Sequence, residues 1–554
     1  MLQNNPILKA LINSLWNTLW SGGIANPLTA IEQITYLLFM KRLDDMEIKL
    51  ERDTQSTGEK YKSKRFSGTY NPYVSESLFQ VTDKMSKAEV KKVQDELKVA
   101  KKPKSKQELR WSNFRRITPT DKMLEHVRYN VFPFIKTLNG ESSPFTKHME
   151  NAVFIIEKPT LLYEAINKIE EIFVEIEKDA NEGGHTFQDI QGDVYEMLLS
   201  EIAQAGKNGQ FRTPRHIIKL MAELVEPQLG QKIADPACGT AGFLLGAYQY
   251  ILTDLVRKKD KRKIEKDDDG FEIATYSAYI DDKIKKILNE SFYGFDIDVT
   301  MVRLGLMNLM MHGIDNPEID YKDSLSKSYN EVGQYDIVLA NPPFTGKIDH
   351  SDVNPSLRIE SGASELLFLD RISSMLCIGG KAAVIIPEGV LFGSSNAQKQ
   401  TREILLKDNQ LEAVISLPSG AFKPYTGVKT AILVFTKVEE KSTTWHTEKV
   451  WFYELQSDGY SLDDNRRRLK DFPLPETKET FANRNKTKNK DRKTHFFVPI
   501  TEILENDLDL SYNRYKEYEY VERSYDPPKE ILSKLMKLEQ EILKDIEELN
   551  SLIG

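Results

Sequence analysis

The sequence contains very little cysteine and no long apolar segment. Its 554 residues include only two cysteines, Cys238 and Cys377, which are far apart in apolar surroundings. This number excludes a disulfide framework and a zinc site built from cysteines, and we expect no bound metal. No run of 18 apolar residues occurs, and the N-terminus lacks the basic start and cleavage site of a signal peptide. We therefore expect a cytoplasmic protein without a membrane segment.

An excess of positive charge is also absent. The formal net charge is -8, with hydrophobic residues at 40% and charged residues at 29%. This balance fits a globular protein with a sizeable core, and the length suggests two or three domains. It argues against a protein that binds nucleic acid alone through one broad basic face. Local basic patches, or a partner that supplies such contacts, stay open.

Hydrophobic periodicity divides the chain into four parts. Residues 1–160 carry apolar residues at helical spacing and predict an all-α N-terminal domain. Residues 161–445 alternate short apolar runs with helical segments, which is typical of a parallel α/β sheet. The last two runs are separated only by SGAFKPYTGVK (419–429), so we expect an antiparallel hairpin at one edge of that sheet.

The C-terminal part contains an irregular segment and a helix. Residues 446–525 predict an irregular extension with a basic, polar loop. Residues 526–554 predict a helix whose apolar residues recur in steps of three and four, forming a narrow stripe. This helix could pack on its own domain or pair with a helix of a partner subunit.

A glycine-rich turn follows the first strand of the predicted sheet. The segment 234–247 reads ADPACGTAGFLLGA, which is a strand end with an acid, a turn and the start of a helix. Small residues let the backbone approach a ligand, and N–H groups at a helix start bind an anion. The turn residues expected to line a cofactor are Gly239, Thr240, Ala241 and Gly242. The alternative is that the glycines serve packing alone, since the segment is neither GxGxxG nor a P-loop.

Two acids come at the ends of later strands. Asp296, in YGFDID, can accept hydrogen bonds from both hydroxyls of a ribose. Asp323, after the following strand, can accept one from an adenine amino group. The alternative is that Asp296 or Asp298 caps a helix. Together with the glycine-rich turn, the acids predict an adenosine-containing cofactor.

The segment DIVLANPPFTG (336–346) ends a buried strand with an amide, two prolines and an aromatic ring. The Asn341 side chain and the Pro342 carbonyl offer two acceptors, which can hold both hydrogens of an –NH2 group. Pro342 and Pro343 stiffen this clamp, and Phe344 offers a face on which a base can stack. The nitrogen lone pair then points at an electrophile, and the nitrogen loses a proton after it has attacked. We therefore expect amino-group methylation, with the methyl of a sulfonium as the electrophile.

These motifs resemble those of the N6-adenine DNA methyltransferases in the gamma motif order. The chain looks closest to the modification subunit of type I restriction–modification systems. That family carries a GQ(F/Y)xTPR segment, matched here at 209–215, and an LLFLKRLSD-like helix, matched at 37–45. Its GVKT segment is matched at 427–430. The resemblance implies a Rossmann-like, class I S-adenosylmethionine-dependent methyltransferase sheet in the α/β class, between the helical N-terminal domain and the C-terminal helix.

The resemblance also implies roles for individual residues. S-adenosylmethionine would be contacted by Thr240 to Gly242 and by the GQFRTPR segment. The residues of that segment are Gln210, Phe211, Arg212, Thr213, Pro214 and Arg215. Asp235 would lie near the methionine part of the cofactor, Asp296 would hold the ribose and Asp323 would meet the adenine. The family often has glutamate where Asp296 stands.

The family further implies an acceptor and partners. Asn341 and the Pro342 carbonyl would bind the N6 amino group of an adenine in DNA, and Phe344 would stack on that base after it flips out. A specificity subunit, a second modification subunit and a restriction subunit would complete the complex. Shared phosphate contacts would then explain the acidic net charge.

Two alternative functions remain open. Loops with the sequence NPP also occur in enzymes that methylate RNA bases or protein glutamine, although those chains are usually shorter. A cofactor-binding scaffold without activity is the other alternative.

Overall fold

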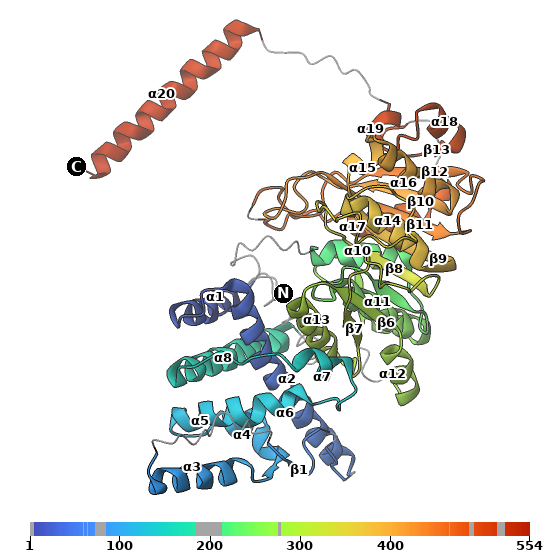
Figure 1. Ribbon diagram of the computed structural model, residues 1–554. Coiled ribbons are helices and arrows are strands. Elements are labelled where there is room, and N and C mark those ends of the chain that lie inside the picture. Colours follow the sequence, from blue (N-terminus) through green and yellow to red (C-terminus); the bar gives the residue numbers. More distant parts are fainter. Residues whose placement is uncertain are drawn as a thin grey trace.

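The chain folds into a helical N-terminal part, a central sheet with helices on both faces, and a separate C-terminal helix. Figure 1 presents this arrangement in a computed structural model. The structure describes residues 5–58, 60–63, 65–72, 85–183, 213–274, 279–464, 466–486, 492–517 and 527–553.

The N-terminal part is helical apart from one short strand pair, as the sequence predicts. Its elements are α1 (Pro6–Ser21), α2 (Pro27–Thr57), β1 (Thr69–Tyr70), α3 (Lys87–Ala100), β2 (Lys104–Ser105), α4 (Trp111–Phe114), α5 (Thr120–His126), α6 (Phe132–Lys136), α7 (Pro144–Met149) and α8 (Pro159–Gly183). Asn-Pro pairs start the two first helices, because the side chains of Asn5 and Asn26 accept hydrogen bonds from the first backbone N–H groups. Proline at the first helical position has no N–H that would be left unpaired.

The central sheet has nine strands. In spatial order they are β13 (His495–Pro499), β12 (Lys449–Glu454), β10 (Asn409–Ser416), β11 (Thr430–Lys437), β9 (Leu376–Pro387), β8 (Tyr335–Ala340), β3 (Ile233–Asp235), β6 (Phe292–Asp296) and β7 (Glu318–Tyr321). The five strands from β9 to β7 are parallel to one another, which confirms the predicted parallel α/β sheet. A separate antiparallel pair, β4 (Ile264–Lys266) and β5 (Glu272–Ala274), lies between β3 and β6 in the sequence.

Helices cover both faces of the sheet. Neighbouring residues of β8 point to opposite cores, with Ile337 and Leu339 in one and Val338 and Ala340 in the other. The first core includes α10 (Arg215–Val225), α11 (Gly242–Lys259), α12 (Asp282–Asn289) and α13 (Val299–Met311). The second core includes α14 (Ser364–Met375), α15 (Gly389–Phe392), α16 (Asn396–Lys407), α18 (Ile500–Glu505) and α19 (Tyr512–Tyr515). Burial of both faces explains why these strands read as continuous apolar runs.

The sheet differs from the prediction on the side of β10. The antiparallel pair of β10 and β11 is present, but it is not the edge, because β12 and β13 extend the sheet beyond β10. Both added strands come from residues 446–525, which the sequence predicted to be irregular. This segment also contains α17 (Leu474–Ala482), which packs against α10.

The helical N-terminal part packs on α13. Arg303 of α13 forms an ion pair of 2.8 Å with Glu32 of α2 and donates a hydrogen bond to the carbonyl of His148. Arg42 donates to the carbonyl of Met311 at the end of the same helix. Because α13 directly follows β6, these contacts connect the helical part to the strands that carry the predicted site.

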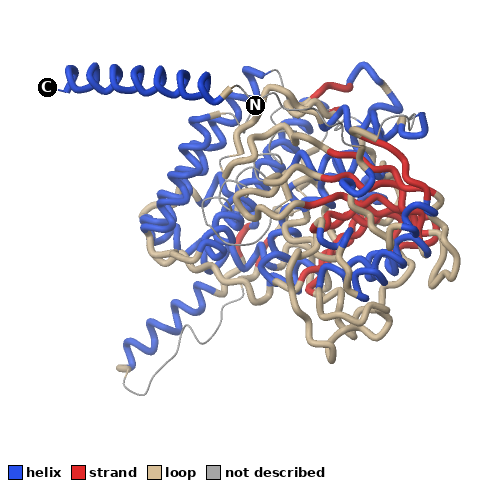
Figure 2. The backbone as a smooth tube through the Cα atoms, turned by 90° about the horizontal axis from the view of Figure 1, so that it is seen from above, coloured by secondary structure: helices blue, strands red, loops and turns tan. Residues whose placement is uncertain are grey.

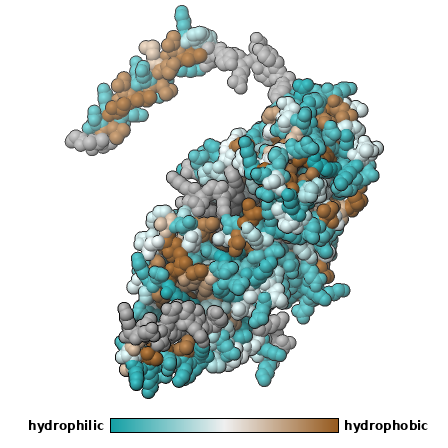
Figure 3. All heavy atoms as spheres, in the orientation of Figure 1, coloured by the Kyte–Doolittle hydropathy of each residue, from teal (hydrophilic) through white to brown (hydrophobic). Residues whose placement is uncertain are grey.

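The C-terminal helix α20 (Pro528–Ile553) stands away from the rest of the chain in Figures 1 and 2. Its apolar side chains are 44–61% exposed, and Figure 3 shows them as a brown band among hydrophilic residues. These residues are Ile531, Leu532, Leu535, Met536, Leu538, Ile542, Leu543, Ile546 and Leu549. None of the helices in the described ranges is long and apolar enough to cross a membrane.

Candidate functional site

The predicted site residues gather at one edge of the sheet. Strands β8, β3, β6 and β7 are parallel neighbours, so their carboxyl ends lie side by side. The polar residues that follow each strand therefore come from distant parts of the sequence and meet at this edge. Parallel α/β sheets bind ligands at this end of their strands.

The glycine-rich turn between β3 and α11 is held in place by hydrogen bonds from two other elements. Gly239 and Ala241 adopt left-handed backbone conformations, with φ of 51° and 63°. The Gly239 N–H donates to Oδ2 of Asp296 at 2.9 Å, and Nδ2 of Asn308 donates to the Thr240 carbonyl at 2.8 Å. The turn is thus fixed before any ligand binds.

Helix α10 supports the turn from one side. A Cβ atom on Gly242 would come within 3.1 Å of Ile218, and one on Gly246 would come within 2.5 Å of it. Both glycines of α11 therefore serve the close packing of the two helices. For Gly242, the packing alternative raised by the sequence is thus part of the explanation.

Asp235, the last residue of β3, is a buried acid with one oxygen unused. Its Oδ1 accepts a hydrogen bond from the Ala237 N–H, while Oδ2 is buried without a hydrogen-bond partner in the described part of the chain. Burial, and to a smaller degree the nearby charge of Asp296, raises the pKa of Asp235 to about 8. The free oxygen can accept a hydrogen bond from a hydroxyl group of a ligand, or from an ammonium group, whose positive charge would favour the carboxylate form of Asp235.

Asp296 and Asp298 have different roles. Asp298 caps α13, because its Oδ1 accepts from the N–H groups of Thr300 and Met301. Asp296 accepts one backbone N–H on each oxygen, from Asp298 and Gly239, which leaves one lone pair on each oxygen for ligand hydroxyls. Burial raises the pKa of the Asp296 carboxyl, although these two N–H groups oppose the shift.

An exposed apolar side chain and a second acid lie near Asp296 at the same edge of the sheet. Ile297 is 66% exposed directly beside Asp296, and an apolar side chain in this place can cover one face of a purine. Asp323 follows β7 and is exposed, with Oδ1 accepting from the Leu325 N–H. Thus both acids predicted to bind an adenosine lie at neighbouring strand ends.

The two polar atoms of the Asn341 amide differ in their hydrogen bonding. Its Nδ2 donates to Oγ1 of Thr213 at 2.8 Å, whereas its buried Oδ1 has no hydrogen-bond partner in the described ranges. The contact with Thr213 therefore sets the amide so that its oxygen is the free acceptor. Pro342 and Pro343 end β8 because neither can donate to the ladder.

Phe344 is 6% exposed and packs on a second aromatic ring. The ring of Phe422 meets it edge to face, with centroids 5.9 Å apart and an interplanar angle of 87°. Phe422 comes from the loop between β10 and β11. One aromatic wall of the site is thus built by two separate loops.

Comparison with known families agrees with this geometry. A family model described as N-6 DNA Methylase matches residues 186–524, which is 339 of the 554 residues. The chain belongs to the N-6 DNA methylase family. A second model, described as HsdM N-terminal domain, matches residues 8–169, which comprise most of the helical N-terminal part of the chain.

Several relatives with similar sequences are methylase subunits of type I restriction enzymes. The type I restriction enzyme EcoEI methylase subunit of Escherichia coli is 32% identical over 345 residues, which cover 60% of this chain and 62% of the relative. The EcoKI methylase subunit of Escherichia coli K12 is 30% identical over 280 residues, covering 49% of each. The match thus spans about three fifths or less of the length of these relatives.

Solved structures share the fold of this chain over nearly its whole length. The type I restriction-modification system methyltransferase subunit from Streptococcus thermophilus is 20% identical, with a TM-score of 0.60, and the match covers 92% of this chain and 100% of that one. A chain from a structure of a type I R-M system is 24% identical, with a TM-score of 0.58 and 98% coverage of both. The expected methyltransferase fold is therefore confirmed.

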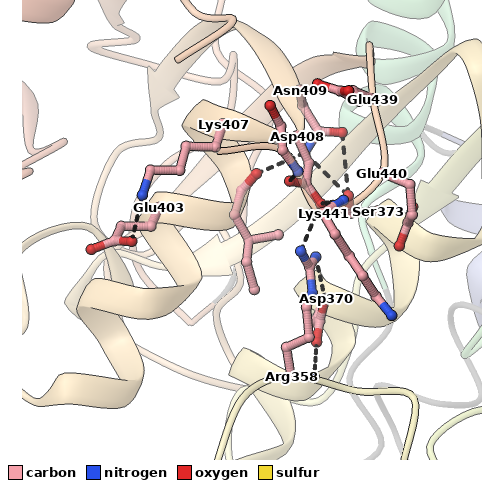
Figure 4. Close-up of polar contacts among 12 residues, drawn as sticks. Arg358, Asp370, Ser373, Glu403, Lys407, Asp408, Asn409, Glu439, Glu440 and Lys441 are labelled. Carbon is pink, nitrogen blue, oxygen red and sulfur yellow. Dashed lines mark hydrogen bonds and ion pairs between the residues drawn. The ribbon is translucent and has the colours of Figure 1, made fainter. Parts of the chain in front are cut away.

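The segment that follows the NPPF motif is anchored on the face of the sheet that α14 and α16 cover, opposite to α10 and α11. Arg358 binds Asp370 of α14 through Nε and Nη2, at 3.2 and 2.8 Å, and binds Asp408 through Nη1 at 2.7 Å (Figure 4). Both carboxylates are buried, and Lys437 lies 3.6 Å from Asp408. The loop after Phe344 is therefore fixed at its far end by a buried charge network.

Not every predicted residue can be placed. Gln210, Phe211 and Arg212 lie outside the described residues. Thr213 contacts Asn341, Pro214 precedes α10, and Arg215 is the first residue of that helix. The GQFRTPR segment was predicted to contact the cofactor, and the structure adds a contact with the amine clamp.

Sequence reasoning missed two residues of the candidate site, Phe422 and the exposed Ile297, and it missed the contact of Thr213 with Asn341. Phe422 is an aromatic residue in a loop that otherwise reads as a turn, which is a weak signal in the sequence. Ile297 lies between two acids in YGFDID, where an exposed apolar residue has no structural purpose of its own. The contact between Thr213 and Asn341 joins positions 128 residues apart, so no local pattern predicts it.

Proposed function

We propose that this chain is the modification subunit of a type I restriction–modification complex. It transfers a methyl group from S-adenosylmethionine to the N6 amino group of adenine in DNA and so protects that DNA from restriction. The observation that carries this proposal is the unpartnered Oδ1 of Asn341, held by Thr213 at the end of the strand beside the glycine-rich turn.

The chain's own residues fit the cofactor. Asp235 Oδ2 would accept a hydrogen bond from the ammonium group, and Asp296 would accept the ribose hydroxyls on its remaining lone pairs. Asp323 would accept from the adenine amino group, with Ile297 against the ring. Gly239 to Gly242 and the described residues Thr213 to Arg215 would line the space between. The cofactor supplies an electrophilic methyl group on a sulfonium.

The clamp activates the amine by orientation. Asn341 Oδ1 and the Pro342 carbonyl accept the two hydrogens of the adenine amino group, which directs the nitrogen lone pair away from the ring conjugation. Pro342 and Pro343 fix this geometry in advance, and Phe344 supports the base. The proton leaves after attack, and the two acceptors stabilise the positive charge that develops on the nitrogen.

We propose a division of labour with other subunits. DNA sequence would be read by a separate specificity subunit, two copies of this chain would flank it, and a restriction subunit would join the complex. The exposed stripe of α20 fits a helix of the specificity subunit better than a place on its own domain, because 44–61% of each side chain is uncovered. The domain limits 1–160, 161–445, 446–525 and 526–554 remain our proposal.

A transfer assay tests the reaction. The chain, with and without its specificity partner, is incubated with labelled S-adenosylmethionine and DNA, RNA or protein. We expect label in DNA, and Asn341→Ala should lower it at least about a hundredfold because one stabilising acceptor is lost. Asn483→Ala, on the exposed end of α17, is the matched control and should change nothing.

The other outcomes separate the alternatives. Label only in RNA or protein would overturn the DNA acceptor. No label in any substrate with the partner present would favour the inactive scaffold.

A pull-down tests the docking of α20. Deletion of 529–554 should prevent capture of the specificity subunit, and undiminished assembly would refute this role of the helix.

A further inference from the structure

A small hairpin in the C-terminal extension contacts the start of α10 and the loop that carries Phe422. It spans residues 459–469, with described arms 459–464 and 466–469. The Leu469 N–H donates to the Gly459 carbonyl at 2.8 Å, and the Ser461 N–H donates to the Arg467 carbonyl at 2.7 Å. We call this element the 459–469 hairpin.

The base of the hairpin is fixed to α10 by a buried charge. The Asp458 side chain is fully buried, and its Oδ2 accepts a hydrogen bond from His216 Nε2 at 3.0 Å and pairs with Arg466. The His216 ring also stacks on Tyr460, with centroids 4.5 Å apart and an angle of 20°. Burial would raise the pKa of Asp458, but the hydrogen bond from His216 and the charge of Arg466 outweigh it and lower that pKa.

His216 is three residues from the catalytic amide contact. Thr213 accepts from Asn341 Nδ2, and Pro214 follows it with a fixed φ of -57° before α10 begins. The short, stiff connection from Thr213 to His216 means that a shift of His216 is passed on to Thr213. Asp458 is therefore connected, through His216 and this short segment, to the Thr213 hydroxyl that orients Asn341.

The tip of the hairpin reaches the aromatic wall. A Cβ atom on Gly420 would come within 2.9 Å of the Leu462 carbonyl oxygen, so these two loops are in close contact. The ammonium group of Lys423 lies 3.4 Å from Asp464. Between Gly420 and Lys423 lies Phe422, whose ring packs on Phe344. The hairpin thus supports the second half of the clamp as well.

We propose that Asp458 is a positioning residue for methyl transfer, which fixes Asn341 through His216 and Thr213 while the hairpin tip fixes Phe422 against Phe344. This inference rests on the proposed function. A buried, fully bonded ionic group is stiff, and small displacements of a reacting group cost large factors in rate.

A pair of matched variants tests the role of Asp458. Asp458→Asn removes the charge that holds the start of α10. Glu223→Gln removes a similar charge at the other end of the same helix, where Glu223 pairs with Lys478 of α17 at 2.6 Å. Both variants exchange a buried carboxylate for an amide at a contact between α10 and the C-terminal extension.

The kinetic result should separate the two sites. In the complete complex, Asp458→Asn should lower kcat about tenfold or more while KM for DNA changes less than about threefold. Glu223→Gln should lower kcat less than about twofold. Equal losses of kcat in the two variants, or an unchanged kcat in Asp458→Asn, would overturn the proposal.

A second variant covers the case in which Asp458→Asn does not fold. His216→Phe keeps an aromatic ring on Tyr460 and leaves Asp458 paired with Arg466, but removes the hydrogen bond. It should show the same loss of kcat, and a normal kcat would equally overturn the proposal.

Hydrogen exchange on the chain alone gives a readout that does not depend on activity. The amides of Ile217 and Ile218 donate to the Pro214 carbonyl, so they report on the first turn of α10. They should exchange about tenfold faster in Asp458→Asn and unchanged in Glu223→Gln. If the wild-type complex transfers no methyl to DNA, the proposed function fails, and this exchange pattern still decides for or against the role of Asp458.

Discussion

At the scale of single residues, some buried polar atoms of the described ranges lack a hydrogen-bond partner. Asn341 Oδ1, Asp235 Oδ2 and Thr430 Oγ1 are buried without a hydrogen-bond partner in the described ranges. Each such atom costs on the order of 1–3 kcal/mol in the free protein. The first two lie where a substrate and a cofactor would bind, so their cost is offset when a ligand supplies the missing hydrogen bond.

The raised pKa of Asp235 makes stability depend on pH. Its folded-state pKa is about 8, against 3.8 as the ordinary value, so the folded chain holds a proton that the unfolded chain releases. The free energy of unfolding should therefore fall as pH rises from about 4 to 8. Asp235→Asn should remove this slope. In urea titrations, the free energy of unfolding of the variant minus that of wild type should increase by about 1 kcal/mol per pH unit between pH 5.5 and 7.5.

The control for this effect is Asp349→Asn. The hydrogen bond from the Ser351 backbone holds the pKa of Asp349 below its usual value, so this residue titrates below the tested range. Its variant should run parallel to wild type. Parallel curves for Asp235→Asn would contradict the assigned burial effect.

Two buried threonines give a second stability test. Thr430→Val removes an unpartnered hydroxyl and should raise the free energy of unfolding by about 1 kcal/mol. Thr447 donates to the Asn409 carbonyl and accepts from the Leu411 N–H, both at 2.9 Å, so Thr447→Val should lower it by about 1–3 kcal/mol. Urea unfolding measures both, and equal signs would show that the Thr430 hydroxyl has a partner.

At the scale of elements, strands of the catalytic sheet could be predicted and the added strands could not. The runs ending at Asp235, Asp296 and Ala340 are apolar and alternate with helical segments, so they could be predicted as strands of a parallel sheet. By contrast, β12 and β13 stand beside charged and polar stretches. They become strands through pairing across the chain, such as Trp451 with Phe497. Such pairing depends on tertiary contacts that no local pattern contains.

The buried ion pairs of Arg358 should contribute strongly to the stability of the fold. Arg358→Leu leaves the carboxylates of Asp370 and Asp408 buried with less compensation, and should lower the free energy of unfolding by about 3 kcal/mol. The exposed pair of Lys122 and Glu125, whose side chains are 63% and 54% exposed, is the control. Lys122→Leu should cost less than about 0.5 kcal/mol in the same urea titration, and similar losses would mean that burial does not strengthen the network.

At the scale of the whole molecule, the catalytic edge is assembled by parts that are far apart in sequence. The NPPF motif, the glycine-rich turn and the acids could be assigned to one site because each follows a parallel strand. The roles of Thr213, Phe422 and Asp458 could not be assigned, since each depends on how a loop lies against another element. Thus the motifs predicted which strand ends carry the candidate site, whereas the contacts that support those residues required the structure.

Helix α20 should be dispensable for the stability of this assembly. Its apolar stripe is exposed, and all five tryptophans precede residue 452, so their fluorescence reports on the rest of the chain. Removal of 529–554 should change the free energy of unfolding by less than about 0.5 kcal/mol. A larger loss would mean that the helix packs on its own domain.

The packing of Ile218 against Gly242 and Gly246 links substitutions in the glycine-rich turn to substitutions in α10. One side chain of α10 fills the space that both glycines leave, and the same helix begins beside the residue that orients Asn341. A larger residue at 246 is therefore compatible only with a smaller one at 218. In a library randomised at 218, 242 and 246, the variants that fold should show inversely correlated side-chain volumes. Substitutions in the glycine-rich turn are then accepted only together with matching substitutions in α10, the helix that begins beside Thr213.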